Sequence, residues 1–398
     1  MNKGDLIIGV ARVAGRKKAA ERADSCAPEA AAKKGKVLGW KVALAAVVAA
    51  LNFSALAFAA AAPGAAEWES TLAAARKEGK VVISGPAGAD VRDALTEGFQ
   101  KKYPGIQVEY DGSSTREFAT RLAAERKAGQ YLWDVFIHGA PEPVIAMGAL
   151  DPLEPALILP DIKNSKTWRG GKIDFLDPGK TIMVMTPFQR GTIFYNTKLV
   201  NAKEFKSYKD LLDPKWKGKI VADDPRRTGP GQATFTLFFL HPELGPDFIR
   251  ALSKQQLTIF RDYGQEVDAV AQGKYPVLLG TADFAAISKM AQGVPIAIVD
   301  PRQLKEGSDV SPANGDLGLF NRAPHPNAAK VFINWLLSKE GQELFARVNG
   351  YVSSRLDVPA DHVPAWRVPQ PGAIKTYVKS ALDAKGDLEV LLKEVFGK

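Results

Sequence analysis

The sequence contains a single cysteine, Cys26, in 398 residues. Cys26 comes before the long apolar run of residues 42–58, so the chain that follows this run has no thiol. A chain without thiols has no disulfide, no cysteine-ligated metal and no cysteine nucleophile. The absence of a cysteine after the run also argues against a lipid anchor. The function of the body of the chain must therefore come from other polar side chains.

Histidines and enzyme motifs are also scarce. No two of the four histidines are three or four residues apart, so no local zinc pattern is present. The sequence has no G-x-S-x-G nucleophile motif, no Walker A loop and no dinucleotide-binding fingerprint. Adjacent carboxylates such as Asp223 and Asp224 can act as acid and base, but at a strand end they more often cap turns. We therefore expect no catalytic residue, no resident metal and no cofactor.

Basic charge is concentrated at the beginning of the chain. The formal net charge is +9, but residues 1–59 hold ten Lys/Arg and four Asp/Glu, which leaves only +3 for the rest. A nearly neutral body has no basic surface of the kind that binds a polyanion. The sequence therefore predicts that nucleic acid is not a partner.

The first 59 residues have the features of an export signal. Four lysines precede an alanine-rich apolar run, and this run ends in the small-residue sequence Ala57-Phe58-Ala59. The pattern is typical of a secretory signal peptide that is cleaved after about Ala59. Because residues 42–62 are nearly long enough to span a bilayer, a single membrane anchor is the alternative. We expect an exported protein whose body begins at residue 60.

From residue 60 onward, segments with strand and helix periodicity alternate. Helices follow predicted strands at residues 81–84, 106–110 and 133–137. Such alternation is typical of a mainly parallel sheet with helices on both faces, and the chain is long enough for two such domains. Ligands of open sheets bind outside the carboxyl ends of the strands. We therefore expect one edge to carry the polar loops 84–88, 111–116 and 138–140.

A second candidate edge lies in residues 207–235, SYKDLLDPKWKGKIVADDPRRTGPGQATF. A short apolar strand at residues 219–222 leads through a Gly/Pro-rich corner into an apolar helix that begins at about Gln232. The first N–H groups of a helix lack intrahelical partners and attract anions. The corner adds three side-chain donors, Arg226, Arg227 and Thr228. The alternative is an ordinary strand-to-helix connection with solvated arginines.

This segment resembles W-x-D-L-L-D-P-K-W-K-G-K-I-x-x-x-D-P…S/T-G-x-G, a pattern of the extracellular solute-binding proteins of ABC importers, in the branch that includes ferric-ion-binding proteins. Two other stretches, FQKKYPGIQVEYDGSSTREFATRLAAE and HPNAAKVFINWLLSKEGQELFARVNGYVSSR, are similar to the same family. The resemblance implies the α/β fold of the type 2 periplasmic binding proteins. In that fold each of two lobes is a mainly parallel sheet flanked by helices, and the ligand cleft lies between the lobes.

The resemblance also implies a location, a partner and a division of the chain. The exported protein is expected in the periplasm, as a monomer that delivers its solute to ABC permease subunits in the inner membrane. The chain is expected to cross between the lobes near residues 186–192, 310–315 and 353. This division gives a leader at 1–59, one lobe at 60–188 plus 313–353, and a second lobe at 189–312 plus 354–398.

Polar corners from both lobes are predicted to face one another across the cleft. Converging helix amino ends, hydroxyls and guanidinium groups suit a small oxyanion, namely a phosphonate, a phosphate ester, a carboxylate or an anionic metal chelate. About half of the hydroxyls are expected to serve only as helix caps, and Arg190 is able to be a structural partner of a carboxylate instead. The candidate ligand-binding residues are Ser84, Gly85, Ser113, Ser114, Thr115, Arg116, His138, Arg190, Arg226, Arg227, Thr228, Gly231, Thr281 and Asp283.

Two other functions remain open. One is a ferric-ion or other metal-binding transport protein: relatives in this family hold iron mainly with adjacent tyrosines, but the matching residues 281–286 include no tyrosine. Asp283 in that stretch is able to ligate a divalent ion or to cap its helix. The other is a secreted hydrolase or transferase on the same fold. For the anion binder, we predict that changing Arg226 and Arg227 to alanine abolishes ligand-induced stabilisation.

Overall fold

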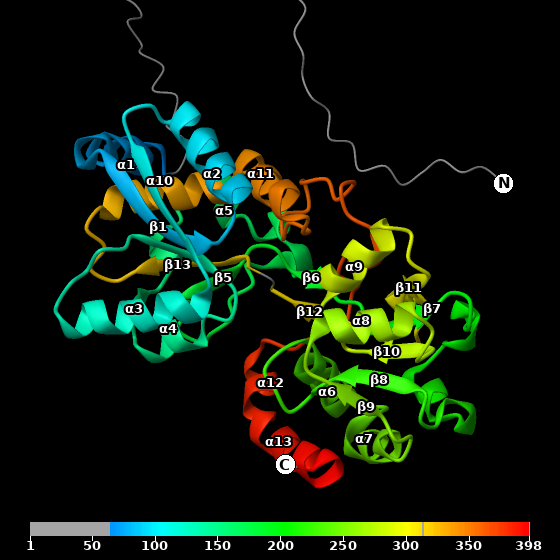
Figure 1. Cartoon of the computed structure of the whole chain (residues 1–398). Coiled ribbons are helices and arrows are strands. Elements are labelled where there is room, and N and C mark those ends of the chain that lie inside the picture. The colour runs from blue at the N-terminus through cyan, green and yellow to red at the C-terminus, as the bar shows by residue number, and fades with distance from the viewer. Residues whose placement is uncertain (1–63, 313, 398) are drawn as a thin grey trace, which may run out of the picture. The chain divides into compact units, whose positions relative to one another are not determined.

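Two mixed β-sheets and a small three-stranded sheet organise the chain (Figure 1). The computed structural model describes residues 64–312 and 314–397, and these residues fall within one structural unit. The predicted signal peptide lies outside the described residues. In the part of the chain that is described, no helix is both long and apolar enough to cross a bilayer.

The first sheet has parallel strands on one side and antiparallel strands on the other. Strand β1 is parallel to β2 and β3, whereas β13 is antiparallel to β3, β4 and β5. The sequence predicted a mainly parallel sheet, and the antiparallel pairs arise because β13 returns to this sheet after the second one has been built. In spatial order the strands are β2 (Gln107–Ser113), β1 (Lys80–Pro86), β3 (Val135–His138), β13 (Asp316–Phe320) and β4 (Leu150–Asp151), with β5 (Ile182–Val184) also on β13.

The second sheet is mixed in the same way. Strand β8 is parallel to β10 and β9, and β7 is antiparallel to β10 and β11. Its strands are short and nearly all apolar, as expected for a sheet that is covered on both faces. In spatial order they are β11 (Ile296–Ile298), β7 (Ile193–Asn196), β10 (Val277–Leu279), β8 (Ile220–Asp223) and β9 (Thr258–Phe260).

The third sheet is made by segments that connect the two larger ones. Its strands are β14 (Ile374–Lys375), β12 (Asp309–Ser311) and β6 (Phe188–Gln189). The first two predicted crossings coincide with β6 and β12. The third was placed near residue 353, but the Ser354 N–H donates to the Met185 carbonyl at 2.7 Å and the Leu356 N–H to Thr167 at 2.8 Å. Residues 354–356 therefore still contact segments next to the first sheet, and the position of the third crossing stays a prediction.

Helices cover both faces of each large sheet (Figure 1). On the first sheet, α1, α2, α10 and α11 bury one face, and α3 and α4 bury the other. On the second, α6, α7 and α13 cover one face, and α8 and α9 the other. The helices are α1 (Ala65–Glu78), α2 (Ala89–Lys102), α3 (Thr115–Lys127), α4 (Glu142–Ala146), α5 (Pro160–Lys163), α6 (Pro230–Leu240), α7 (Gly245–Ser253), α8 (Tyr263–Ala271), α9 (Asp283–Ala291), α10 (Pro326–Leu337), α11 (Lys339–Asn349), α12 (Lys379–Asp383) and α13 (Lys385–Phe396).

An aromatic cluster fixes α2 and α10 on the first sheet. Phe99, Phe332 and Trp335 are each at most 1% exposed, and their ring centroids are 5.0–5.4 Å apart. Aromatic pairs in tilted geometry add about 0.5–1.5 kcal/mol each to the free energy of burial. The start of α10 is tied to the sheet by Asp134, which accepts the His325 N–H at 2.7 Å and the Val82 N–H at 2.7 Å. These contacts hold the scaffold from which the loops at the sheet edge project.

Candidate functional site

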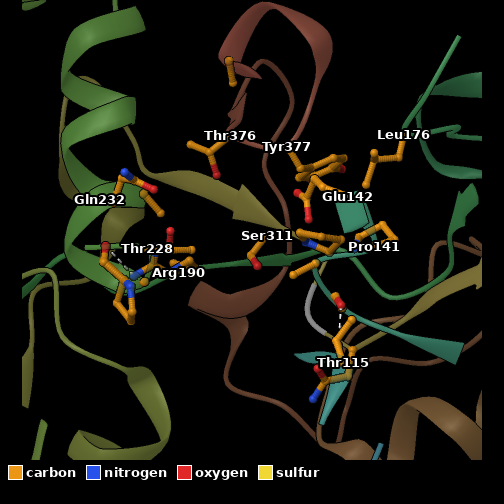
Figure 2. A pocket seen from close by; sticks show the side chains of 18 of the residues that line it. Thr115, Pro141, Glu142, Leu176, Arg190, Thr228, Gln232, Ser311, Thr376 and Tyr377 are labelled. Atoms are coloured by element: carbon orange, nitrogen blue, oxygen red, sulfur yellow. Dashed lines mark hydrogen bonds between the residues drawn. The ribbon is translucent and has the colours of Figure 1, made fainter. Parts of the chain in front are cut away.

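A cavity of about 1200 Å³ lies between loops of the two large sheets. Its wall is formed by the beginnings of α3, α4, α6 and α9, by the three-stranded sheet and by the C-terminal segment. Figure 2 shows Thr228, Gln232 and Arg190 on one side, Ser311 in the middle, and Glu142 with Tyr377 on the other side. The charged residues in this wall are Arg116, Glu142, Arg190, Asp283, Arg367 and Lys385.

Five of the fourteen predicted site residues line this cavity: Thr115, Arg116, Arg190, Thr228 and Asp283. They come from α3, the residue after β6, the corner before α6, and α9, so the structure does bring the 113–116 and 226–231 corners to one hollow. The other nine predicted residues do not line it: Ser84, Gly85, Ser113, Ser114, His138, Arg226, Arg227, Gly231 and Thr281. Each of these has a structural neighbour that explains its position.

Ser84 and His138 form a buried pair behind the cavity wall. The Ser84 Oγ lies 2.8 Å from the His138 Nε2, and the imidazole contacts the rings of both Phe118 and Phe136. Burial lowers the pKa of His138 to about 4, so this side chain is neutral at pH 7. Gly85 is packed so closely against Tyr110 that an added Cβ would lie 2.2 Å from the phenolic oxygen. The first predicted loop therefore serves packing in this structure.

The hydroxyls at residues 113 and 114 are used within their own corner. Ser114 is the N-cap of α3 in a full capping box, with its Oγ accepting the Glu117 N–H and the Glu117 carboxylate accepting the Ser114 N–H. Ser113 donates to Asp111 at 3.3 Å. Only Thr115 reaches the cavity, and its Oγ1 donates to the Gly139 carbonyl at 2.7 Å, which joins two of the predicted loops.

The amino end of α6 already holds a carboxylate of this chain. The Gly231 N–H donates to the Asp223 Oδ2 at 2.7 Å, and a Cβ at Gly231 would lie 2.5 Å from the Asp223 carbonyl oxygen. Burial raises the pKa of Asp223, and the Gly231 N–H opposes that shift. The Gly231 N–H, which the sequence suggested as an anion donor, is therefore already bonded to Asp223. From this corner, Thr228 and residues at the start of α6 line the cavity.

Arg226 and Arg227 point to other partners. The Arg226 guanidinium donates to both oxygens of Asp224, at 2.7 and 3.0 Å, and to the Phe396 carbonyl at 2.9 Å. Arg227 is exposed and donates to the Arg261 carbonyl at 3.1 Å. Thr281 is fully buried beside Glu266. Arg226 and Arg227 thus fit the alternative prediction of an ordinary strand-to-helix connection. Arg226 differs from that prediction in one respect, because it bonds the buried Asp224 carboxylate and not solvent.

We expect the change Arg226→Ala to weaken the fold without touching the cavity. Asp224 is 0% exposed, and the variant leaves it with only the largely exposed Arg261 as a charged partner. An incompletely paired buried carboxylate costs about 1–3 kcal/mol of unfolding free energy, which urea denaturation measures. The matched control is Arg227→Ala, an exposed residue for which a change within about 0.5 kcal/mol is expected. An Arg226 variant with unchanged stability would refute this assignment.

Arg116, Glu142 and Lys385 are the exposed charged residues of the cavity wall. Within the described residues, none of their side chains makes an ion pair or hydrogen bond. Arg116 lies in the first turn of α3, where a cation opposes the helix dipole and is unfavourable for the isolated helix. A position that is unfavourable for the fold and faces a cavity is a good candidate for ligand contact.

Arg190 joins the three-stranded sheet to the start of α6. Its guanidinium donates to the Asp309 carboxylate at 3.4 Å and to the Pro230 carbonyl at 3.1 Å. The side chain is only 7% exposed, and Asp309 is fully buried. The sequence left open whether Arg190 contacts a ligand or a carboxylate; the structure shows the carboxylate and also places Arg190 in the cavity wall.

Arg367 is a cavity residue that sequence reasoning missed. Its guanidinium carbon lies 4.6 Å from the ring centroid of Phe188 and 5.5 Å from that of Tyr351, and its Nη2 lies 3.9 Å from the Asp283 carboxylate. Its buried Nε has no hydrogen-bond partner among the described residues. Arg367 follows Trp366 in a Pro-rich stretch without helix or strand periodicity, so no sequence pattern pointed to it.

Asp283 is the buried acid of the cavity wall. Its carboxylate accepts the Gly191 N–H at 3.2 Å. This hydrogen bond joins the start of α9 to the segment that follows β6. Burial raises the pKa of Asp283 to about 6, although the nearby Arg190 and Arg367 oppose this shift. The carboxyl is therefore partly protonated near neutral pH, and it loses its charge below pH 6.

Among the described residues, carboxylate, imidazole and thiol side chains do not cluster in the cavity wall. Within residues 64–312 and 314–397, no group of three or more His, Cys, Asp or Glu side chains could hold a metal ion. Two tyrosines, Tyr351 and Tyr377, do line the cavity. Burial raises the pKa of both phenols, so both are neutral in the protein without a ligand.

Comparison with known sequences identifies relatives of this chain. The family model described as bacterial extracellular solute-binding protein matches residues 94–371, which is more than two thirds of the chain. An uncharacterized protein of Haemophilus influenzae is 25% identical over 285 residues, which cover 68% of this chain and 76% of that protein.

Comparison with solved structures gives the same architecture at low sequence identity. A Trichodesmium protein (IdiA, FutA) in complex with iron and citrate ligands superposes with a TM-score of 0.60 at 19% identity, over 80% of this chain and all of that one. The protein AfuA from Actinobacillus pleuropneumoniae, with fructose-6-phosphate bound, superposes with a TM-score of 0.51 at 20% identity, over 79% of this chain and 97% of that one. At such identities the likeness concerns the fold alone.

Proposed function

Because this chain belongs to the family of bacterial extracellular solute-binding proteins, with their two-lobe α/β fold, we propose that it captures a small anionic solute in the cavity and delivers it to an ABC permease. The solute class is a phosphonate, a phosphate ester, a carboxylate or an anionic metal chelate. The cavity wall would bind this solute by charge-assisted hydrogen bonds from guanidinium groups and hydroxyls.

One observation carries the proposal: cationic side chains outnumber acidic ones in the cavity wall. Four basic residues face two acids there, and burial keeps one of the acids, Asp283, partly protonated. The Arg116 side chain has no ion-pair partner among the described residues. The Arg367 guanidinium lies 3.9 Å from Asp283, and its own buried Nε has no hydrogen-bond partner among these residues. Thr228 and Gln232 add neutral donors. Such a wall favours an anion over a neutral or cationic molecule.

The ligands of the structural relatives are compatible with this class. One relative holds iron with citrate, and another holds fructose-6-phosphate. Carboxylate and phosphate groups are both oxyanions that guanidinium groups bind in a bidentate manner. These ligands support an oxyanion without selecting one for this chain.

The proposed mechanism is capture by closure of two lobes on the solute. The lobes would be residues 60–188 plus 313–353 and residues 189–312 plus 354–398, with the contacts of residues 354–356 extending the first lobe slightly. The three strands β6, β12 and β14 would act as the hinge. Closure would exclude water and strengthen each charged contact. The protein would act as a periplasmic monomer, exported by the leader of residues 1–59, because the cleft edges must stay free for the permease.

The two alternatives find less support in the cavity. The resemblance leads us to expect a ferric-ion carrier to hold iron mainly with adjacent tyrosines, and the matching residues 281–286 of this chain include none. A hydrolase or transferase would need an activated nucleophile, and the Ser84–His138 pair lies outside the cavity wall with a histidine whose pKa is lowered by burial. We therefore propose a protein that binds its solute and leaves it unchanged.

The deciding experiment is recovery of the natural solute. Gently purified protein would be denatured and the released molecules identified by mass spectrometry. The identified anion should then raise the melting temperature in proportion to its concentration, and it should be recovered intact after long incubation. Release of a transition metal without an organic or inorganic oxyanion would favour the metal carrier, and release of a converted product would favour the enzyme.

Binding of the solute should strengthen as the pH falls through 6. Deprotonated Asp283 places a negative charge beside Arg367, and protonation below its raised pKa of about 6 removes that charge. At distances of several Å and intermediate dielectric, this change is worth about tenfold in affinity. Calorimetric titration at pH 7.5 and pH 5 would measure it. Asp283→Asn is the control, because the ratio of the affinities of the two proteins at each pH cancels the titration of the solute itself. Equal pH profiles of the two affinities would refute the prediction.

A further inference from the structure

One end of the cavity is acidic. Glu142, at the start of α4, is exposed there and makes no ion pair within the described residues. Figure 2 places Glu142 beside Tyr377, Pro141 and Leu176, across the cavity from Arg190. An exposed glutamate is ordinary on a surface, but in the wall of an anion site it repels the ligand unless it contacts a cationic part of it.

Asp316 is a second acid on the same side, and it is buried. Its side chain is 0% exposed, and neither carboxylate oxygen has a hydrogen bond among the described residues. A buried carboxylate without a partner is costly, which makes it a strong indicator of an unassigned role.

Strand alternation shows where the Asp316 side chain points. Leu317 and Leu319 belong to the core on one face of β13, so Asp316 and Phe320 point to the opposite face. That face contains Leu176 and Tyr377, which are both cavity residues. The unpartnered carboxylate is thus directed toward the side of the sheet that carries the acidic end of the cavity.

The other charges near Asp316 do not neutralise it. Asp174 lies close by, but it is paired with the Lys375 ammonium and accepts the Tyr377 hydroxyl at 3.1 Å. Burial, and then the negative charges of Glu142 and Asp174, raise the pKa of Asp316. Without a cationic ligand, the ionised form of Asp316 is therefore disfavoured, and Glu142 has no ion-pair partner among the described residues.

We infer that Glu142 and Asp316, together with the Tyr377 hydroxyl, form a subsite for an ammonium group, so that the solute is a zwitterion with an anionic and a cationic end. This inference rests on the anion site proposed above. An ammonium at this end would donate to the Glu142 carboxylate, and Asp316 would add negative charge from the sheet face beneath. Binding would favour the ionised form of Asp316, so a proton would pass from its carboxyl group to the solvent.

The test uses two probes that differ only by an ammonium group, ethyl phosphate and O-phosphorylethanolamine. At pH 8 both phosphates are dianions, and calorimetry in two buffers of different ionisation enthalpy reports affinity and proton release together. We expect the aminated probe to bind at least about tenfold more tightly, since a charged hydrogen bond is worth about 1.5–3 kcal/mol. We also expect proton release with the aminated probe alone.

Three variants locate the effect. Glu142→Gln should remove most of the preference for the aminated probe while leaving the affinity for ethyl phosphate equal or higher. Asp316→Asn should abolish the proton release. Glu154→Gln, an exposed acid outside the cavity that pairs with Lys180, is the matched control and should change neither quantity.

The possible outcomes separate this inference from the proposed function. Equal affinity of the two probes for the native protein overturns the ammonium subsite and leaves the anion site standing. Binding of ethylamine together with failure of both phosphates overturns the anion site, and the zwitterion with it. A preference for the aminated probe that survives Glu142→Gln overturns the assignment of this residue.

Discussion

The double change of Arg116 and Arg367 to alanine is expected to lower the affinity for the natural solute by at least about 100-fold. Each guanidinium would make charge-assisted hydrogen bonds worth about 1.5–3 kcal/mol, and tenfold in affinity corresponds to about 1.4 kcal/mol. The two residues reach the cavity from different parts of the chain, α3 and the segment before α12. Isothermal titration calorimetry measures the loss directly.

The single variants separate binding from folding. Arg116→Ala should not lower the unfolding free energy, because the side chain has no internal partner among the described residues and opposes the dipole of α3. Arg367→Ala should cost about 0.5–2 kcal/mol, because it removes the contacts with Phe188 and Tyr351. Arg116→Lys keeps the charge and loses bidentate geometry, so it should bind at intermediate strength. Undiminished affinity in a folded double variant would refute the proposed site.

The variants of Arg116 and Arg367 replace the variants of Arg226 and Arg227 that the sequence suggested as a test of solute binding. Arg226 and Arg227 stand beside a glycine-rich helix start, which is the local pattern of an anion site. The pattern does not reveal that Asp223, eight residues before Gly231, returns to accept its N–H, or that Asp224 takes the Arg226 guanidinium. A strand that ends in two aspartates gave a hint of both contacts. We therefore expect an Arg227→Ala protein to bind the solute normally.

The fold was easier to predict than the site. Strand and helix periodicity and the solute-binding motif gave the α/β fold correctly, since these signals depend on residues close in sequence. Antiparallel β13 and the three-stranded sheet depend on pairing between distant segments, which periodicity does not specify. The same reason applies to strand β14, where Ile374 pairs with Asp309 of β12.

Several of the site residues that were missed come from the C-terminal third of the chain. Arg367, Tyr351 and Tyr377 line the cavity although their segments have no ligand-binding pattern in the sequence. They are placed there by contacts over long sequence distances, such as Tyr377 with Asp174 and Arg367 with Phe188. In a fold whose chain crosses repeatedly between two sheets, cavity residues are gathered from many segments, so local motifs find only some of them.

Glu266 is expected to be a position where a single change stabilises the protein. Its side chain on α8 is 0% exposed, and neither carboxylate oxygen has a hydrogen bond among the described residues. Burial raises the pKa of Glu266 to about 8, and the neighbouring Thr281 hydroxyl offsets only part of this shift. Glu266→Gln should therefore increase the unfolding free energy at pH 7 by about 2–4 kcal/mol, because the unfolded chain no longer gains by ionising this carboxyl.

The pH dependence distinguishes this cause from a simple packing effect. A carboxyl whose pKa is raised by folding contributes fully to stability below its unfolded pKa of about 4.3, and the contribution is lost as the pH rises toward its folded pKa of about 8. The gain from Glu266→Gln should thus be near zero at pH 4, grow with pH, and level off above pH 8. Urea denaturation at pH 4.5, 6, 7 and 8 measures it, with Glu97→Gln on α2 as an exposed control. A gain that does not change with pH would show that ionisation of Glu266 is not its cause.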